Sequence, residues 1–346
     1  MKAVQWFAPR DLRLVDMPKP APAPYEALIR VESTGICGSD MHSYLDGRIG
    51  DTVITSPLVL GHEYAGVIEA VGDRSDPALV GKRVAVEPGL PCFECEWCRS
   101  GHYNVCPRLE FPGLFPFHGA LCEYKTARAD FCFPVPNSMT SAEAALVEPL
   151  AVAVHTVELA RLRPGETAAV LGLGPIGLLT AAVAKLCGVS CLYGSDLLEY
   201  RVRAGQRHGV DCAFNAAEED TVDVIMKETC GRGVDVVFDC ARSVHTPGIA
   251  CRILRPAGRA VLTGISGESD GVLPVDVARR KELTLTWCRR FLFNYPAAIE
   301  LAGSGKVDLR SLITHSFPLE QAQDAFELVA QFADGVLKVS IDQIDR

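Results

Sequence analysis

Four cysteines with the spacing of metal ligands stand in the segment PCFECEWCRSGHYNVC. They are Cys92, Cys95, Cys98 and Cys106, spaced C-x2-C-x2-C-x7-C. Thiolates so close in sequence can converge on one tetrahedral Zn²⁺, at about 2.3 Å each. Scattered free thiols or disulfides are the alternative interpretation. Because four protein ligands leave no open position, we expect this metal to hold structure rather than to do chemistry.

Two other segments carry candidate ligands for a second metal ion, one that keeps an open position. TGICGSDMH contains Cys37, and LGHEYAGVIEAVG contains His62 and Glu63. A thiolate, an imidazole and one carboxylate would leave the fourth position of a zinc ion to water or substrate. Asp40 is a candidate acceptor that orients the imidazole of His62. The residues alone are equally compatible with a buried thiol and a surface histidine.

A glycine pattern of the kind that binds dinucleotides occurs in AAVLGLGPIGLL, where Gly172, Gly174 and Gly177 form G-x-G-x-x-G. The pattern follows an apolar strand-like segment and opens an apolar helix-like one, which is the context that the mechanism needs. Such glycines allow a tight turn and close approach of the backbone to a pyrophosphate, which the helix N-terminus then holds. A glycine turn in an α/β domain without a nucleotide is the alternative.

Asp196 ends the next strand-like segment, CLYGSD. A carboxylate at this place accepts hydrogen bonds from ribose hydroxyls and repels a 2′-phosphate, so it favours NAD over NADP. Arg201 lies five residues further on and keeps NADP open as an alternative. The other residues expected to contact the coenzyme are Pro175, Ile176, Thr263, Gly264 and Ile265.

The bulk properties are those of an ordinary globular protein of two or three domains. The 346 residues are 48% hydrophobic and 22% charged. The net charge of -9 argues against a broad electrostatic grip on nucleic acid or on an anionic membrane. No run of eighteen apolar residues and no secretory pattern is present, and the 14 cysteines fit a reducing compartment. We therefore expect a cytoplasmic location.

The pattern of apolar and turn-forming residues changes near residue 151. The first 150 residues contain short β-branched runs broken by glycine and proline, which predicts a mostly antiparallel β domain. From 151 onwards, apolar strands alternate with helical segments, which predicts a parallel α/β sheet with helices on both faces. The last segment, from about 295, can either extend that sheet domain or fold back onto the first one.

Taken together, these motifs resemble the medium-chain zinc alcohol dehydrogenases. GHEYAGVIEAVGDRS is similar to the family's zinc signature, and CGSD, the four-cysteine lobe and GLGPIG occur in the family's order along essentially the whole chain. The resemblance implies an α/β fold with a GroES-like β-barrel catalytic domain over 1–150, completed by about 291–346, with the structural-zinc lobe at 88–110. It also implies a Rossmann doubly wound NAD-binding domain over 151–290, an active site in the cleft between the domains, two zinc ions per chain, and a dimer or homotetramer.

Within the family, the sequence is most similar to the polyol branch, whose members act on sorbitol or xylitol. CGSDMHSYLDGRIG resembles that branch's loop after the zinc cysteine. In the branch, the residues that match Cys37, His62 and Glu63 hold the catalytic zinc. Glu148, in ALVEPLAVAVH, matches a glutamate that contacts the metal through water. A solvated carboxylate is the alternative for Glu148.

The residues that would contact the substrate depart in part from the polyol branch. Arg290 matches an arginine that touches the polyol, with a salt-bridged surface arginine as the alternative. Ser43 and Phe291 stand where the branch carries tyrosines, although Tyr44 lies alongside. The absence of both phenols weakens the case for sorbitol itself.

The resemblance also implies a mechanism. The metal would make a substrate hydroxyl acidic, and a hydride would pass to the nicotinamide. Ser39 would take the proton and pass it through the coenzyme ribose to His42, whereas a turn hydroxyl and an exposed imidazole are the alternative. Lys338, in GVLKVSI, is expected near the coenzyme phosphates or, alternatively, as a lysine on an edge strand.

The expected reaction is the oxidation of a secondary alcohol of a sugar alcohol or cyclitol to a ketone. An amino-alcohol dehydrogenase of the threonine type is the alternative within enzymes. A non-catalytic, zinc-stabilised binding protein is the alternative from another class. Its lobe, however, lacks the basic cluster and the helix-borne histidines of nucleic-acid-binding zinc modules.

Overall fold

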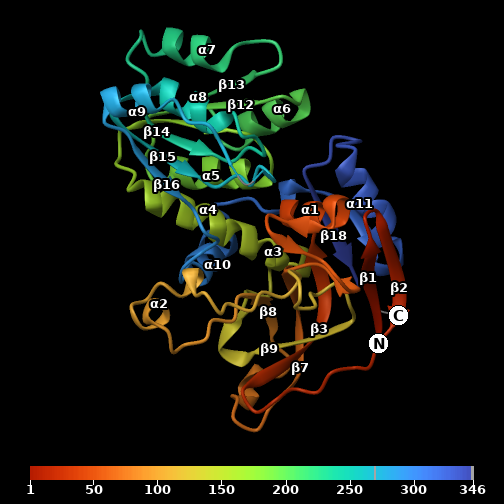
Figure 1. Ribbon diagram of the computed structural model, residues 1–346. Helices are drawn as coiled ribbons and strands as arrows, with labels where there is room; N and C mark the ends of the chain where they lie inside the picture. The colour runs from red at the N-terminus through yellow and green to blue at the C-terminus, as the bar shows by residue number, and fades with distance from the viewer. Residues whose placement is uncertain (269, 344–346) are drawn as a thin grey trace. The chain divides into compact units, whose positions relative to one another are not determined.

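The computed structural model of the chain describes residues 1–268 and 270–343, and these form two compact units. Unit 1 comprises Met1–Glu148 and Tyr295–Arg346, and unit 2 comprises Pro149–Asn294. Unit 1 is built on mostly antiparallel sheets and unit 2 on one parallel sheet, which confirms the predicted α/β class (Figure 1). No helix in the described ranges is long and apolar enough to cross a membrane.

Unit 1 contains twelve of the described strands, most of them in one large sheet. The strands are β1 (Lys2–Ala8), β2 (Asp11–Asp16), β3 (Glu26–Gly35), β4 (Arg48–Ile49), β5 (Thr52–Val53), β6 (Leu58–Val59), β7 (Glu63–Val71), β8 (Arg83–Val86), β9 (Tyr124–Arg128), β10 (Cys132–Pro134), β17 (Ile313–Pro318) and β18 (Lys338–Asp342). The α-helices are α1 (Gly38–Asp46), α2 (Glu96–Arg99), α3 (Ser141–Ala145), α10 (Tyr295–Gly303) and α11 (Ala322–Ala330), and α4 (Val147–Ala160) continues into unit 2. Short 3-10 helices are η1 (Pro77–Leu79), η2 (Tyr103–Val105), η3 (Ala129–Phe131), η4 (Arg310–Leu312) and η5 (Leu319–Gln321).

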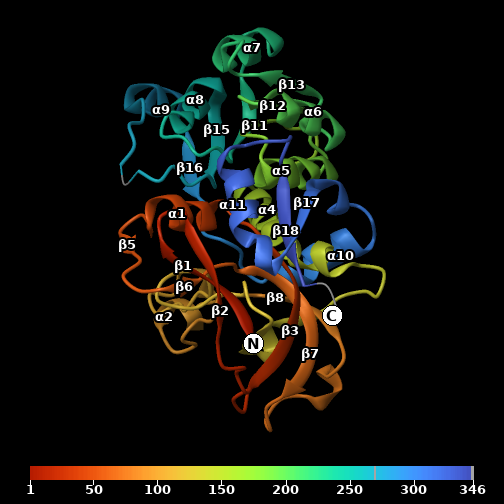
Figure 2. The same ribbon diagram turned by 90° about the vertical axis from the view of Figure 1, so that its right-hand side faces the viewer.

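Strand β3 organises unit 1 because it pairs with β7, β9 and β18. Its apolar side chains pack with those of β7 and β8 in a buried cluster that includes Ile29, Ile68 and Val84. β18 comes from the end of the chain and lies between β3 and β17 in the order β10-β8-β7-β3-β18-β17 (Figure 2). The C-terminal segment therefore folds back onto the first domain, which is one of the two arrangements that the sequence left open.

Unit 2 is a six-stranded parallel sheet in the order β13-β12-β11-β14-β15-β16. Its strands are β11 (Thr167–Leu171), β12 (Cys191–Asp196), β13 (Cys212–Asn215), β14 (Val234–Asp239), β15 (Leu254–Leu262) and β16 (Thr284–Trp287). Its helices are α5 (Pro175–Leu186), α6 (Glu199–Arg207), α7 (Thr221–Glu228), α8 (Thr246–Ile253) and α9 (Val275–Lys281). Figure 1 shows α7, α8 and α9 on one face of this sheet and α5 and α6 on the other. The strand order reverses between β11 and β14, which is where open parallel sheets bind ligands at their carboxyl ends.

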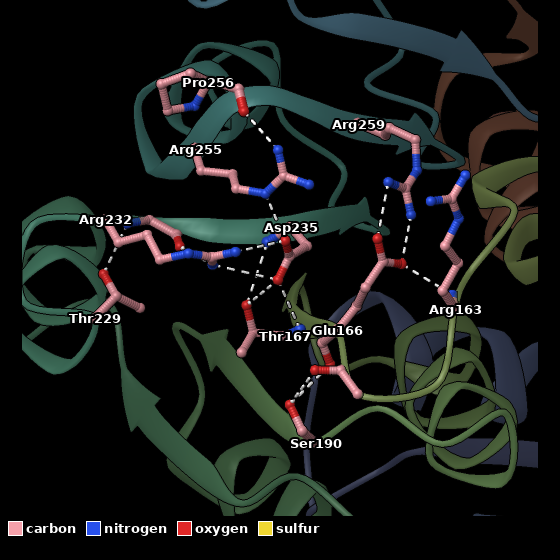
Figure 3. Close-up of polar contacts among 12 residues, drawn as sticks. Arg163, Glu166, Thr167, Ser190, Thr229, Arg232, Asp235, Arg255, Pro256 and Arg259 are labelled. Atoms are coloured by element: carbon pink, nitrogen blue, oxygen red, sulfur yellow. Dashed lines mark hydrogen bonds and ion pairs between the residues drawn. The ribbon is translucent and has the colours of Figure 1, made fainter.

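The opposite, amino-terminal ends of these strands are held by a network around Asp235 (Figure 3). The side chain of Asp235 is only 7% exposed. It accepts hydrogen bonds from Arg232 Nη2 at 2.8 Å, Arg255 Nε at 2.5 Å and the backbone N–H of Thr167 at 3.0 Å. Burial alone would raise the pKa of Asp235, but the two guanidinium groups and Thr167 hold it well below its usual value of 3.8. One carboxylate thus ties β11, β14 and β15 together.

We expect Asp235→Ala to lower the free energy of unfolding of unit 2 by about 3 kcal/mol, because it removes the shared acceptor of this network. Glu199→Ala is the matched control, since Glu199 pairs with Arg203 on an exposed helix face and its loss should change stability by less than about 1 kcal/mol. Chemical denaturation of both variants measures the difference. Equal losses in the two variants would refute the role given to Asp235.

Candidate functional site

Three of the predicted metal ligands, Cys37, His62 and Glu63, lie close together where β3 ends and β7 begins. β3 ends at Gly35, and Cys37 follows as the N-cap residue of α1. β7 begins at Glu63, directly after His62, and Glu63 pairs opposite Gly35. The antiparallel pairing brings together the ligand atoms of Cys37, His62 and Glu63, which all lie within 4.8 Å of one another. Cys37 and the pair His62 and Glu63 are thus close in space although they lie in separate segments of the sequence.

A buried carboxylate, that of Asp40, lies beside these three donors. Asp40 is fully buried and accepts hydrogen bonds from the backbone N–H groups of Cys37 at 2.9 Å and Gly61 at 3.2 Å. Its Oδ1 atom lies 3.5 Å from Nδ1 of His62. Burial alone would lower the pKa of His62, but the charges of Asp40 and Cys37 raise it well above 6.5. A buried cluster that favours positive charge in this way fits a divalent cation, and its sulfur, nitrogen and oxygen donors suit Zn²⁺.

Lys338 takes a position that the sequence analysis did not predict. Its side chain is 4% exposed, forms an ion pair with Oε2 of Glu63 and donates a hydrogen bond to the carbonyl of Ile36 at 2.9 Å. The alternative of a lysine on an edge strand is therefore wrong. β18 lies between β3 and β17, so it is an interior strand, and within unit 1 the ammonium group is directed at Glu63. Burial lowers the pKa of Lys338, but the charges of Glu63, Cys37 and Glu148 raise it above 10.5, so the lysine is charged at neutral pH.

Helix α1 carries the two residues of the expected proton path. Ser39 Oγ lies 3.4 Å from Nε2 of His62. His42 lies one helical turn further on, and its Nδ1 is 3.4 Å from Oδ2 of Asp46. At 4% exposure, His42 is not the exposed imidazole of the alternative interpretation.

The next two residues of α1, Ser43 and Tyr44, are both buried. Ser43 is 2% exposed. Tyr44 donates a hydrogen bond to Oε1 of Glu327 at 2.5 Å and accepts one from Nε2 of Gln323 at 2.7 Å. The phenol of Tyr44 is thus engaged by residues at the start and on the body of α11.

Three other residues were predicted to serve the metal or the substrate, Glu148 in unit 1 and Arg290 and Phe291 in unit 2. Glu148 is in the first turn of α4 and is 5% exposed, so the alternative of a solvated carboxylate is wrong. It is not part of the set of donors that meet within 4.8 Å. Arg290 and Phe291 follow β16 in unit 2; Phe291 is buried, and Arg290 has a left-handed backbone with φ of 58°.

The four lobe cysteines converge as their spacing predicts. The sulfur atoms of Cys95 and Cys98 are 3.4 Å apart, those of Cys92 and Cys106 are 3.5 Å apart, and Cys92–Cys98 and Cys95–Cys106 are 3.8 Å apart. A tetrahedron with metal–sulfur bonds of about 2.3 Å has edges of about 3.8 Å, whereas a disulfide bond is about 2.05 Å long. The geometry therefore fits a closed metal site. Without a metal the four thiols differ: the backbone N–H of Glu94 lowers the pKa of Cys92 to about 6, whereas burial raises the pKa of Cys98 to about 12. The distances between the sulfur atoms, rather than these pKa values, are therefore the evidence for a metal site.

A buried hydrogen bond links this lobe to the main sheet. The phenol of Tyr103, in η2, donates to Oε1 of Glu87, just beyond β8, at 2.6 Å. Burial raises the pKa of Glu87 to about 7 from 4.5, although the bond from Tyr103 acts in the opposite direction. The folded state thus holds this proton more tightly than the unfolded state does. Its contribution to stability is present at low pH and is lost as pH rises through about 7.

We expect the free energy of unfolding of the parent protein to fall by about 1.4 kcal/mol on account of Glu87 between pH 6 and pH 8.5. Glu87→Gln should lack this loss, because its amide oxygen still accepts from Tyr103 without ionising. Chemical denaturation of both proteins at the two pH values measures the difference. Parallel pH dependences would show that Glu87 does not titrate in this range.

The glycine pattern of unit 2 forms the expected strand–turn–helix. Gly172 follows β11 with φ of 89°, and Gly174 is the N-cap of α5. A Cβ atom on Gly177 would overlap the carbonyl oxygen of Gly172, so the turn closes against the helix only with glycine there. Pro175 and Ile176 form the first turn of α5. The backbone N–H groups at this helix end are available to an anion such as a pyrophosphate.

Asp196 lies at the carboxyl end of β12, beside this turn. Its two oxygens accept hydrogen bonds from the backbone N–H groups of Leu173 at 2.8 Å and Leu198 at 3.0 Å. Nη1 of Arg201 is 3.8 Å from the carboxylate of Asp196. The structure therefore brings together Asp196, Arg201 and the glycine turn in one unit.

The segment after β15 also reaches the carboxyl edge of this sheet. The backbone N–H groups of Thr263 and Gly264 both donate to the carbonyl of Asp239, at 2.8 and 2.9 Å. The side chain of Thr263 lies 3.1 Å from Thr156 Oγ1, and Ile265 is 47% exposed. These residues lie at the end of β15, the strand next to β14 and so close to the reversal point of the sheet.

Comparison with known proteins bears out the resemblance. The family described as alcohol dehydrogenase GroES-like domain matches residues 23–137, and the zinc-binding dehydrogenase family matches residues 175–304. Sorbitol dehydrogenase of Bacillus subtilis (strain 168) is 39% identical over 341 residues, covering 99% of this chain and 97% of the relative. D-xylulose reductase A of Aspergillus niger is 39% identical over 314 residues, covering 88% and 87%. The crystal structure of a short chain alcohol dehydrogenase from E. coli CFT073 complexed with NADH has a TM-score of 0.92 at 29% identity and covers 99% of both chains.

The chain therefore belongs to the zinc-binding alcohol dehydrogenases with a GroES-like domain. Its likeness to sorbitol dehydrogenase and D-xylulose reductase confirms the predicted polyol branch of that family. An oxidoreductase, rather than a non-catalytic binding protein, is thereby confirmed.

Proposed function

We propose that this chain oxidises a secondary alcohol of a polyol, a sugar alcohol or cyclitol, to a ketone with NAD as the hydride acceptor. The observation that carries the proposal is the convergence of Cys37, His62 and Glu63 within 4.8 Å in a buried cluster. Three protein donors match a catalytic zinc site, because a tetrahedral ion then keeps one position for the substrate. When bound, Zn²⁺ supplies a Lewis acid that lowers the pKa of an alcohol.

The chain's own side chains would then handle the proton. Ser39 and His42 are on one face of α1, one turn apart, and Ser39 Oγ faces the ring of His62 at 3.4 Å. We propose that Ser39 accepts the hydroxyl proton and that His42, beside Asp46, receives it in turn. Glu148, buried near Lys338, is proposed to hold a water at the metal. For Ser43, Arg290 and Phe291, a role in substrate binding stays a prediction from the family resemblance.

A panel of alcohols with NAD tests the proposed function. Sorbitol, xylitol, a cyclitol, threonine and a primary alcohol are offered separately, and formation of NADH is followed by its absorbance. We expect turnover with at least one polyol and little with the primary alcohol. Turnover with threonine alone would favour the amino-alcohol alternative, and no reduction of NAD with any secondary alcohol would refute the proposal.

Asp196 supports NAD as the coenzyme, since its fixed carboxylate stands beside the glycine turn. We expect Asp196→Ser to lower the ratio of kcat/KM for NAD to that for NADP by about 10²-fold, because a like-charge repulsion against a 2′-phosphate is worth several kcal/mol. Arg201 remains in the variant to receive that phosphate. Steady-state kinetics with both coenzymes checks this, and Glu199→Ser serves as a control on the nearby surface. An unchanged ratio would remove Asp196 from coenzyme selection.

We further propose that the protein is a homo-oligomer, a dimer or tetramer, located in the cytoplasm. Support for self-association comes from apolar side chains exposed on unit 2, Val272 at 88%, Val275 at 71% and Trp287 at 65%, the last on the edge strand β16. Support for a reducing compartment comes from the 14 cysteines, none of which forms a disulfide bond in the described part of the chain. Light scattering after size exclusion measures the subunit number, and a monomer would refute the proposal of an oligomer.

A further inference from the structure

An ion pair crosses the central strand of unit 1 at the candidate catalytic site. In the sheet, β3 lies between β7 and β18. Gly35 on β3 is opposite Glu63 on one side and opposite Ser340 on the other, and Lys338 is two residues before Ser340 on the same face of β18. The side chains of Glu63 and Lys338 therefore point to one face of the sheet from strands that are not neighbours. They meet above Gly35.

Gly35 provides the space for this contact. A Cβ atom on Gly35 would overlap the carboxylate of Glu63 and lie 3.2 Å from Cε of Lys338. Any other residue would thus push apart the two charged side chains. The glycine is required here for space, because its backbone belongs to an ordinary extended strand.

The ion pair is also fully enclosed. Glu63 and Lys338 are 1% and 4% exposed, and Lys338 has a second hydrogen bond, to the carbonyl of Ile36, which precedes Cys37. Burying an ammonium group in the interior of a protein costs several kcal/mol unless it is paired. A leucine or methionine would satisfy a purely structural role at this position more simply. We therefore infer that the positive charge of Lys338 is needed for its ion pair with Glu63.

We propose that Lys338 is a positioning residue for the metal ligand Glu63. Gly35 allows this contact because it has no side chain to separate the two charged groups. Lys338 holds Oε2 of Glu63, so that the other carboxylate oxygen is left for a cation beside Cys37 and His62. Groups that orient a ligand in this way typically change metal affinity by about 10–100-fold. The inference rests on the proposed role of Glu63 as a ligand, and it is tested separately from that role.

The test compares metal binding in Lys338→Met, Lys338→Arg and Lys185→Met. Lys338→Met keeps the length of the apolar stem and removes the charge, whereas Lys338→Arg keeps the charge. Lys185→Met removes the ion pair to Asp211 on the surface of unit 2 and is the matched control. We call the metal at Cys37, His62 and Glu63 the inner zinc and the metal at the four lobe cysteines the lobe zinc. The readouts are the rate at which a chelator removes the inner zinc and the visible spectrum of the inner site loaded with Co²⁺. The lobe zinc serves as the internal reference.

We expect Lys338→Met to lose the inner zinc about 10–100-fold faster and to change the Co²⁺ spectrum. Lys338→Arg should recover most of the affinity, and Lys185→Met should match the parent. Parent-like or tighter binding in Lys338→Met would overturn the inference. If that variant does not fold, Lys338→Gln, a neutral donor, is measured in its place with an intermediate loss expected; parent-like binding in it would equally overturn the inference.

A parallel Glu63→Ala variant separates the two proposals. If it leaves the Co²⁺ spectrum unchanged, Glu63 is not a ligand and the proposed site itself fails. If Glu63→Ala alters the spectrum and Lys338→Met does not, only the role of Lys338 fails.

Discussion

Replacing Cys37 by alanine is expected to abolish polyol oxidation while leaving the fold intact. Cys37 supplies the sulfur donor of the cluster of three, and a site with two protein donors would not retain zinc. Loss of the Lewis acid removes several kcal/mol of transition-state stabilisation, so we expect kcat to fall by at least about 10³-fold. Initial rates of NADH formation, with zinc counted in the same samples, measure the effect.

The zinc count makes this result specific. The parent should contain two zinc ions per chain and Cys37→Ala one, with an unchanged circular dichroism spectrum. Cys187→Ala is the matched control, because Cys187 is an exposed cysteine at the end of α5. Full activity in Cys37→Ala would refute the assignment of the ligands.

Replacing Cys95 by alanine is expected to damage stability far more than chemistry. The four lobe sulfurs lie 3.4–3.8 Å apart, so each is an equal member of one closed site. Zinc in such a site contributes roughly 10 kcal/mol to the folding of a small module at neutral pH. We therefore expect loss of the lobe zinc, a large fall in melting temperature and aggregation on heating.

The protein that remains folded should still carry the inner zinc, so its activity per folded molecule should stay within a few fold of the parent. Thermal denaturation, zinc analysis and rates on the soluble fraction test this together. A parent-like melting temperature in Cys95→Ala, with one zinc lost, would contradict a structural role for the lobe.

The parts of the site that could be predicted from the sequence are those whose members are close along the chain. The four lobe cysteines fall within fifteen residues, and the glycines of the coenzyme turn within six. Short spacing constrains geometry, so the spacing alone indicates a closed metal site and a phosphate-binding turn. Asp196 follows from the same unit because the next parallel strand must end beside the turn.

Contacts between segments that are distant in sequence could not be predicted from residue spacing alone. Cys37 and Glu63 are brought together by strand pairing. Their residue types made them candidate ligands of one metal, but only the family resemblance favoured this over a buried thiol and a surface histidine. The contact of Lys338 with Glu63 depends on the strand order β7-β3-β18, which no local pattern specifies. A signal was nonetheless present, since a lysine between the apolar residues Leu337 and Val339 is typical of a buried and paired charge.

The sequence also did not predict the directions in which some side chains point. Tyr44 is adjacent to Ser43 in sequence, yet its phenol is bound by Glu327 and Gln323 from the C-terminal segment. Similarly, nothing in the sequence near Asp235 indicated that it joins β14 to β11 through Thr167 and to β15 through Arg255. Such directions depend on which segments fold back against one another, and the sequence had left the place of the C-terminal segment open.

The measurement that tests the account most directly is removal and return of the inner zinc. A chelator mild enough to leave the lobe zinc is applied to the parent protein, and NADH formation from a polyol is followed as one equivalent of Zn²⁺ is added back. The account predicts that activity disappears with the first zinc lost and returns in proportion to the zinc restored. Full turnover by protein that holds only the lobe zinc would contradict it.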